Sequence, residues 1–451
     1  MSASSSVSSA VSRRRFIYTS TISAVAVTLL PGCASPRHFK SPGEKLNVGI
    51  IGVGGKGESD ADGLAGENIV AICDVDENTL NKAAQKYPNA KRYRDYRRML
   101  DQQKDLDAVT VSTPDHHHFP ASMMAMQLGK HVYCQKPLTH TIWEARMMAK
   151  TARRYKVATQ MGNQGHSSDS VRSFCELIWA GAIGPVREVH CWSNRPIWPQ
   201  GLERPREAAP VPANLDWDLW IGPAPMRPYA INAEEKKPAY HPFAWRGFWD
   251  FGTGALGDMA CHIMDAAFWS LHLTNPTSVE AESSAVNQET APKSAMITYQ
   301  FPARKKMVPV KLVWYDGGRK PANELMGVTD AKKIPDNGSL FVGDKGKMTI
   351  ETYGGKPTLL PGSTNQELVT PPKTLRRVGG HYKEWISACK GGEAASSNFD
   401  YAGPFTEMVL LGNLAVRTGK KILWDGSAMK AKNVPEAAQY IRKEYRQGWK
   451  V

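Results

Sequence analysis

Paired cysteines are the first thing that this 451-residue sequence lacks. Apart from Cys33, its six cysteines show neither a C-x-x-C pair nor the even spacing of a disulfide framework. We therefore expect most of them to be buried thiols, in a protein that folds in a reducing cytoplasm. They are Cys73, Cys134, Cys175, Cys191, Cys261 and Cys389.

Long apolar runs are absent too. The N-terminal run Thr21–Leu30 is too short and weak for a membrane span. It follows the stretch S-R-R-R-F-I at Ser12–Ile17, a layout typical of a twin-arginine signal, which exports proteins already folded. The run leads into L-P-G-C at Cys33, which resembles a lipobox, although an ordinary cleavage site nearby is the alternative. We expect removal of residues 1–32 and a periplasmic protein that is soluble or tethered by lipid at Cys33.

Runs of like charge are scarce, although the formal net charge is +14. Removal of residues 1–32, which hold three arginines and no acids, leaves +11. Because no basic run exceeds Arg13–Arg15, nucleic acid is a poor candidate partner. Anionic glycans and a solvated, lipid-facing surface are equally compatible with this charge.

A dinucleotide-binding layout is present between Asn47 and Asp74. An apolar strand candidate, Val48–Ile51, leads into glycines with G-x-G-x-x-G spacing, and a second, Ile69–Cys73, ends at Asp74. Glycine permits the tight turn, the approach of a pyrophosphate and close helix packing, and the helix N-terminus offers N–H groups to phosphate. A phosphate-free turn is the alternative, but the flanking strands, helix and acid favour the cofactor. The glycines are Gly52, Gly54 and Gly57, with Gly55 beside them.

The carboxylate of Asp74 favours NAD over NADP, because it can accept both ribose hydroxyls and repels a 2′-phosphate. A cofactor bound before export travels inside the folded protein, and a periplasm is not expected to hold free NAD. These points favour a tightly bound cofactor that is regenerated within each turnover.

Strand and helix candidates alternate as far as about residue 165. Strands at Ala108–Ser112 and His131–Cys134 run into Thr113-Pro114 and Gln135-Lys136-Pro137. The carboxyl ends of parallel strands supply the ligand groups in such sheets. We therefore predict an α/β Rossmann domain, a doubly wound parallel sheet, over residues 45–165.

The character of the sequence changes from about Val186, where strand candidates are separated by Gly- and Pro-rich turns. This pattern predicts an α+β C-terminal domain over residues 166–425, with a large open, mainly antiparallel sheet. Its last helix is expected at about 402–418. Residues 426–451 are left as a C-terminal tail.

The order of these motifs resembles that of the Gfo/Idh/MocA oxidoreductases. The resemblance extends from about Lys45 to Trp424, and it implies a two-domain enzyme that oxidises or reduces sugar or cyclitol hydroxyls. It also implies a homodimer or homotetramer. The family's usual E-K-P reads Q-K-P here, so the glutamate's charge is lost. The shared motifs are the glycine turn, Asp74, Thr113-Pro114, Lys136-Pro137 and a D-x-x-x-H stretch.

By this resemblance Lys136, Asp258 and His262 are catalytic. An ammonium group stabilises the alkoxide that forms as hydride leaves. Asp258 and His262 are four residues apart on one helix face, where a histidine can take the hydroxyl proton and the acid can orient it or hold the sugar. The alternatives are a strand-end lysine in water and a helix-surface pair. Asp265 is interpreted as a surface or structural acid.

Further cofactor contacts are expected at the ends of the parallel strands. A plain loop is the alternative for the histidines 116–118, and helix capping for Asn163. Adjacent histidines cannot converge on one ion and no ligand cluster surrounds them, so no metal is predicted. The expected cofactor contacts are Thr113, Pro114, His117, Gln135, Lys136, Asn163 and Gln164.

Substrate contacts are expected among aromatic residues. Seven of the 13 tryptophans lie between residues 192 and 269, and flat indoles suit the apolar faces of sugar rings, although packing is the commoner use of any one. Trp245 and Arg246 are the preferred candidates, with Tyr382 and His381 behind them.

Three functions follow from these expectations. The first is an NAD-dependent dehydrogenase for a small carbohydrate. The second is a redox-neutral glycosidase, in which transient oxidation at C3 acidifies the C2 proton, the aglycone is eliminated, water adds and the hydride returns. The third is a non-catalytic sugar-binding lipoprotein, since a fold alone does not prove activity.

Overall fold

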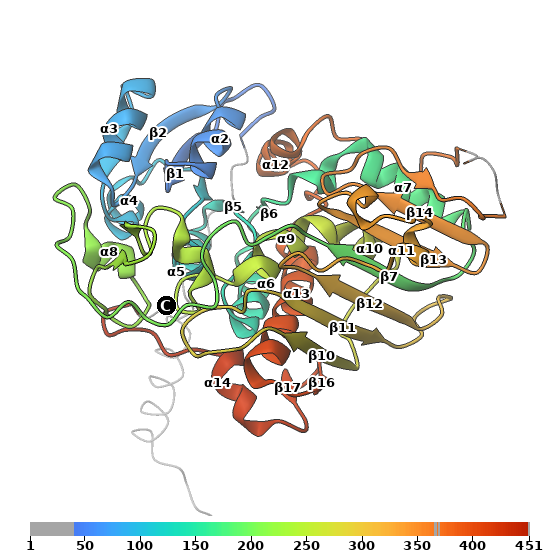
Figure 1. Ribbon diagram of the computed structural model, residues 1–451. Coiled ribbons are helices and arrows are strands. Elements are labelled where there is room, and N and C mark those ends of the chain that lie inside the picture. The colour runs from blue at the N-terminus through green and yellow to red at the C-terminus, as the bar shows by residue number, and fades with distance from the viewer. Residues whose placement is uncertain (1–39, 365–367, 369, 450–451) are drawn as a thin grey trace, which may run out of the picture. The chain divides into compact units, whose positions relative to one another are not determined.

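The computed structural model describes residues 40–364, 368 and 370–449, so the predicted signal sequence and Cys33 lie outside the described residues. The first sheet has six parallel strands in the order β3-β2-β1-β4-β5-β6 (Figure 1). Strand order runs outward in both directions from the neighbours β1 and β4, and a crevice opens at the carboxyl ends of such strands. The strands are β1 (Asn47–Ile51), β2 (Asn68–Cys73), β3 (Lys91–Tyr93), β4 (Ala108–Val111), β5 (His131–Cys134) and β6 (Thr159–Met161).

Helices connect these strands, and polar caps fix where several of them begin. Asp76 and Asp95 each accept a backbone N–H in the first turn of the helix that follows them. Thr141 and Glu144 form a reciprocal capping box directly after the Lys136-Pro137 segment. The helices are α2 (Lys56–Gly63), α3 (Glu77–Lys86), α4 (Tyr96–Gln102), α5 (Asp115–Gln127) and α6 (Ile142–Tyr155).

The second sheet has nine strands in the order β15-β14-β13-β7-β12-β11-β10-β16-β17. Its neighbours are antiparallel except for the parallel pair of β7 and β12. Side chains of β11 alternate between buried and half-buried, as in a sheet with one face on the core. The strands are β7 (Val186–Trp192), β10 (Ser278–Ser283), β11 (Ala295–Phe301), β12 (Val310–Tyr315), β13 (Gly338–Gly343), β14 (Gly346–Ile350), β15 (Thr358–Leu359), β16 (Ile422–Asp425) and β17 (Lys430–Ala431).

Helix α13 (Phe399–Thr418) joins the two domains, because it packs on β10 and β11 of the second sheet and on α6 of the first domain (Figure 1). A Cβ atom at Gly412 would lie 2.2 Å from the Tyr299 hydroxyl, so glycine is needed for this approach of helix to sheet. The other helices of the second domain are α7 (Asp169–Trp179), α9 (Gly254–Ile263), α10 (Asp265–Ser270), α11 (Asn323–Met326), α12 (His381–Cys389) and α14 (Ala438–Ile441).

The segment between β7 and α9, residues 193–253, returns to the first domain. It contains α8 (Trp217–Ile221) and a two-stranded sheet of β8 (Ile231–Asn232) and β9 (Lys237–Pro238). The Asp216 N–H donates to the Val75 carbonyl at 3.0 Å, and the Glu77 N–H donates to the Asn214 carbonyl at 2.8 Å. This segment therefore covers the carboxyl end of β2.

The predicted fold class is confirmed, since a doubly wound parallel sheet precedes an α+β domain with a mainly antiparallel sheet. The last long helix, expected at 402–418, begins at Phe399. Strand β10 is not predicted from S-V-E-A-E-S, because its side chains are mostly polar and the pairing with β11 and β16 makes it a strand. The six predicted thiols are free and buried. Within the described ranges, no helix has the length and apolar character of a membrane span.

Candidate active site

A cavity of about 800 Å³ lies at the carboxyl ends of the parallel strands. The glycine turn and the ends of β2, β4 and β5 line it from the first domain. Helix α9 and the 193–253 segment line it from the second domain. Both predicted halves of the site, the cofactor motif and the D-x-x-x-H stretch, therefore border one space.

The glycine turn has the geometry that a dinucleotide requires. Gly52 has φ +80°, and a Cβ atom there would lie 2.7 Å from the Ser112 carbonyl oxygen. A Cβ atom at Gly57 would lie 1.8 Å from the carbonyl oxygen of Gly52, so only glycine lets α2 begin this close to the turn. Gly55 has φ +52° and faces open space. Backbone exposed in this way, at a helix N-terminus, fits a pyrophosphate.

The carboxylate of Asp74 lines the cavity where β2 ends. Its Oδ2 accepts the Val53 N–H and its Oδ1 accepts the Asp76 N–H, each at 3.0 Å. Burial raises the pKa of Asp74 to about 6, and these two N–H groups limit the rise. The group is therefore mainly ionised at neutral pH, and each oxygen keeps a lone pair for a ribose hydroxyl.

Lys136 forms an ion pair with Asp258 across the two domains. The lysine follows β5, and its Nζ lies 2.8 Å from Asp258 Oδ1 and 2.7 Å from the Asp258 carbonyl oxygen. Burial alone would raise the pKa of Asp258, but Lys136 and Arg246 together hold it below its usual value. Asp258 is therefore a carboxylate at neutral pH, and it fixes the position of the lysine ammonium.

His262 lies one helical turn after Asp258 on α9 and also lines the cavity. Burial, reinforced by the charge of Lys136, lowers the pKa of His262 to about 3. The imidazole is therefore neutral, so it can accept a hydrogen bond from a hydroxyl, although the low pKa makes it a weaker base than a free histidine. Its Nδ1 has no hydrogen-bond partner among the described residues, and the ring of Tyr353 packs edge-on at 4.9 Å.

Most of the other predicted contacts also line the cavity. His117 is held there by a 3.0 Å contact between its Nε2 and the Trp220 carbonyl, and burial lowers its pKa to about 4. The lining residues named in the sequence analysis are Thr113, Pro114, His117, Gln135, Gln164, Trp245 and Arg246, besides Gly52, Gly54, Gly55, Asp74 and the catalytic candidates. Gly57 is buried where α2 meets the turn and does not line the cavity.

Two side chains predicted as contacts lie elsewhere. Asn163 is fully buried. Its Nδ2 donates to Asp265 Oδ1 at 3.2 Å, and its Oδ1 accepts a hydrogen bond from the Ser397 hydroxyl at 2.6 Å. Asp265 is thus a buried structural acid. Tyr382 does not line the cavity, since its ring packs beside α2 and its hydroxyl donates to Asp60 at 2.7 Å.

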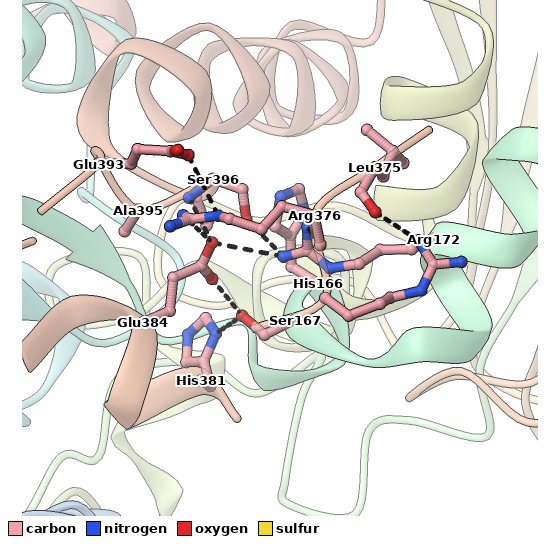
Figure 2. A network of polar contacts seen from close by, with 12 residues as sticks. His166, Ser167, Arg172, Leu375, Arg376, His381, Glu384, Glu393, Ala395 and Ser396 are labelled. Carbon is pink, nitrogen blue, oxygen red and sulfur yellow. Dashed lines mark hydrogen bonds and ion pairs between the residues drawn. The ribbon is translucent and has the colours of Figure 1, made fainter. Parts of the chain in front are cut away.

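His381, the weaker candidate, belongs to a polar network that docks α12 (Figure 2). The Ser167 hydroxyl lies 2.7 Å from both His381 Nδ1 and Glu384 Oε2, and His381 Nε2 contacts the Met161 carbonyl at 2.8 Å. Arg172 and Arg376 each lie 3.4 Å from Glu384. The network fixes α12, which carries Tyr382, against the 3₁₀ turn at 164–167 and α7, outside the cavity wall.

Sequence reasoning missed several groups in the cavity wall, among them Arg195, His241 and Tyr353 of the second domain. Each belongs to a loop of the second domain without a motif. Of these three, only Arg195 could have been found from the sequence, because it closely follows the predicted strand 186–192 and strand ends often supply site residues.

Two family models match the chain in succession. The model described as an oxidoreductase family with an NAD-binding Rossmann fold matches residues 46–163. The model of the same oxidoreductase family's C-terminal alpha/beta domain matches residues 187–309. The chain belongs to the Gfo/Idh/MocA family. Its first domain is the NAD-binding Rossmann domain of that family.

Curated relatives of this Gfo/Idh/MocA protein match it over part of their length. An inositol 2-dehydrogenase of Salmonella typhimurium is 28% identical over 151 residues, which are 32% of this chain and 45% of the relative. A glycosyl hydrolase family 109 protein of Saccharopolyspora erythraea is 31% identical over 158 residues, 32% of this chain and 34% of the relative. The matches thus span less than half of either relative.

The WlbA dehydrogenase from Bordetella pertussis, solved in complex with NADH and UDP-GlcNAcA, shares the fold over both domains. Its TM-score is 0.60 at 16% identity, with 85% of this chain and 99% of that chain covered.

The family's glutamate before Lys-Pro is replaced by Gln135, and the structure shows where a carboxylate stands instead. Gln135 Nε2 donates to both oxygens of Asp60, at 3.0 and 2.8 Å. Asp60 is fully buried on α2 and accepts three more hydrogen bonds, from Ser112 at 2.6 Å, Tyr382 at 2.7 Å and Lys56 at 2.7 Å. A negative charge therefore remains beneath the glycine turn, but a different residue carries it.

Asp74→Asn is expected to weaken NAD binding by about 10- to 100-fold, since hydrogen bonds to a charged group contribute about 1.5–3 kcal/mol. The ratio of NAD affinity to NADP affinity should fall, because the variant has no carboxylate to repel the 2′-phosphate of NADP. Isothermal titration with each dinucleotide measures both effects. Asp95→Asn is the matched control, because that carboxylate also borders the cavity but is held by Arg97 at 2.7 Å. An unchanged preference in Asp74→Asn would contradict the assignment.

Gln135→Glu should destabilise the protein at neutral pH, because it sets two carboxylates against each other in a buried site, and one of them can relieve the repulsion only by taking up a proton. The double variant Gln135→Glu/Asp60→Asn again pairs one amide with one carboxylate. It should therefore recover a large part of the free energy of unfolding that Gln135→Glu loses. Urea unfolding of both, beside Asp60→Asn alone, measures the coupling. Equal stability of the single and double variants would show that the Gln135–Asp60 contact does not matter.

Proposed function

We propose that this protein is an NAD-dependent oxidoreductase acting on a hydroxyl of a sugar, glycoside or cyclitol. The observation that carries the proposal is the shared cavity. The Lys136–Asp258 pair and the neutral imidazole of His262 line the space that the glycine turn opens. The inositol 2-dehydrogenase among its curated relatives supports this class of substrate.

Each group in the cavity has a separate role in the proposed hydride transfer. NAD, held by the glycine turn and Asp74, supplies the hydride acceptor and donor. Neutral His262 takes the proton of the reacting hydroxyl. The Lys136 ammonium donates to the same oxygen and stabilises the negative charge that develops there. Asp258 holds Lys136 in place, and the aromatic ring of Trp245 offers a flat wall for the sugar.

A second candidate is the redox-neutral glycosidase, and the glycosyl hydrolase family 109 relatives favour it. It needs the same groups, together with a base for the proton at C2 and access of water to the oxidised sugar. The cofactor returns to its starting state in each turnover, which suits a protein exported with its NAD. The non-catalytic sugar-binding lipoprotein is the remaining alternative.

The setting that we propose follows from the N-terminal sequence. The protein leaves the cytoplasm folded by the twin-arginine route, carries its NAD with it, and works in the periplasm, anchored by lipid on Cys33. We further propose that it forms a homodimer or homotetramer and does not bind nucleic acid.

Nitrophenyl glycosides separate the two enzymatic functions. Purified protein without added NAD should release nitrophenol with no net NADH if it is a glycosidase, and should form NADH in step with sugar oxidation if it is a dehydrogenase. Lys136→Met and His262→Gln should each lower kcat by about 10²- to 10³-fold, the usual effect of losing one transition-state donor or base.

Lys104→Met is the matched control for this experiment, since Lys104 is exposed and does not line the cavity. Turnover that survives in both site variants would contradict the assignment of these residues. Sugar binding without turnover, unaffected by Lys136→Met, would indicate the non-catalytic lipoprotein instead.

A further inference from the structure

Three cationic side chains surround one carboxylate at the substrate end of the cavity. Asp258 oxygens lie 2.8 Å from Lys136 Nζ, 3.6 Å from Arg246 Nε and 3.9 Å from Arg195 Nε. The three cations come from different places, namely the end of β5, the 3₁₀ turn at 244–247 and the loop after β7. These four groups carry a formal net charge of +2.

Both guanidinium groups keep unused hydrogen-bond donors. An arginine has five N–H donors in a planar fork. Arg246 Nη1 donates to the Phe243 carbonyl at 3.0 Å, and Arg195 Nη1 donates to Asn194 Oδ1 at 2.6 Å. No other guanidinium hydrogen bond connects either arginine to the described residues. Because both side chains line the cavity and are 24% exposed, the spare N–H groups are within reach of a ligand.

Aromatic rings fix the position of Arg246. Its guanidinium lies 4.4 Å from the ring centre of Trp245, 4.5 Å from that of Phe243 and 5.9 Å from that of Trp198. Stacking of this kind holds the plane of a guanidinium and leaves its edge free for hydrogen bonds. Such a preorganised fork matches a planar carboxylate or a sulfate group.

The neighbouring acid does not cancel this charge. Asp115 is buried at the cavity wall, where the Thr253 hydroxyl donates to its Oδ2 at 2.7 Å. Burial raises the pKa of Asp115 to about 7, so only part of the population is ionised at neutral pH. His262 is neutral and adds no charge of either sign. The substrate end of the cavity therefore stays positive.

We propose that the substrate is an anionic sugar, with a carboxylate or sulfate ester bound by Arg246 and Arg195 while its reacting hydroxyl contacts Lys136 and His262. This inference rests on the proposed function and names the class of substrate. A neutral sugar would leave the two guanidinium groups without an acidic partner besides the shared Asp258. An anionic substituent supplies the missing charge and holds the ring in one orientation.

Matched sugar pairs test the proposal on the NAD-loaded protein. Methyl glucoside, galactoside and mannoside are compared with their uronic acids and with their 6-sulfates. Formation of NADH gives kcat/KM, and quenching of tryptophan fluorescence gives an affinity that does not depend on turnover. For the preferred pair, kcat/KM and affinity should be about 10- to 100-fold higher for the acidic sugar than for the neutral one, which is the contribution of a charge-assisted hydrogen bond. The preference should shrink as salt rises.

Arg246→Met and Arg195→Met should each reduce the ratio of acidic to neutral sugar, in both affinity and kcat/KM. Arg187→Met is the matched control, because Arg187 is exposed on β7, pairs with Asp344 and is absent from the cavity wall. The uronic acids and the 6-sulfates show which anionic group the fork accepts.

Two results would overturn the inference. One is a kcat/KM for neutral sugars that equals or exceeds that for acidic sugars, together with arginine variants that lower kcat/KM for both sugars of a pair by the same factor. The cations would then stabilise only the developing alkoxide. The other is failure of every acidic sugar to bind. Either leaves the oxidoreductase intact if neutral sugars yield NADH. Acid-selective binding without hydride exchange would instead support the ligand class and refute the proposed function.

Discussion

The ion pair between Lys136 and Asp258 is the contact on which the site depends. It joins a strand end of the first domain to a helix of the second, with both side chains largely withdrawn from water. Removing one partner of such a pair leaves the other charge buried and uncompensated. The pair therefore connects the end of β5 to α9, the helix that brings His262 to the same cavity as the glycine turn.

Charge changes along the cavity in the direction that the chemistry needs. Asp74 sets a carboxylate at the end of β2, where ribose hydroxyls bind, and the glycine turn offers backbone N–H groups beside it. The opposite end, around Asp258, is positive because two arginines and Lys136 converge there. An oxyanion forming at a sugar hydroxyl is stabilised at that end.

Local patterns made much of this predictable. The G-x-G-x-x-G spacing, the acid after β2 and the strand-end lysine are short-range signals, and each lies where its pattern placed it. Contacts that depend on long-range packing could not be predicted. No pattern in the sequence near Asp60 indicates that Gln135 and Tyr382 both bind its carboxylate. Asn163 followed a strand as a ligand residue should, yet the buried Asp265 and Ser397 engage its amide. Arg195 stood at a strand end without a motif to mark it.

The most direct test of the account is a crystal structure of the protein with NAD and a bound sugar. The account predicts one sugar hydroxyl within hydrogen-bond distance of both the Lys136 ammonium and the His262 imidazole, with the nicotinamide ring against the carbon that bears it. A nicotinamide ring turned away from this pair, or a sugar that contacts only one of the two side chains, would contradict it.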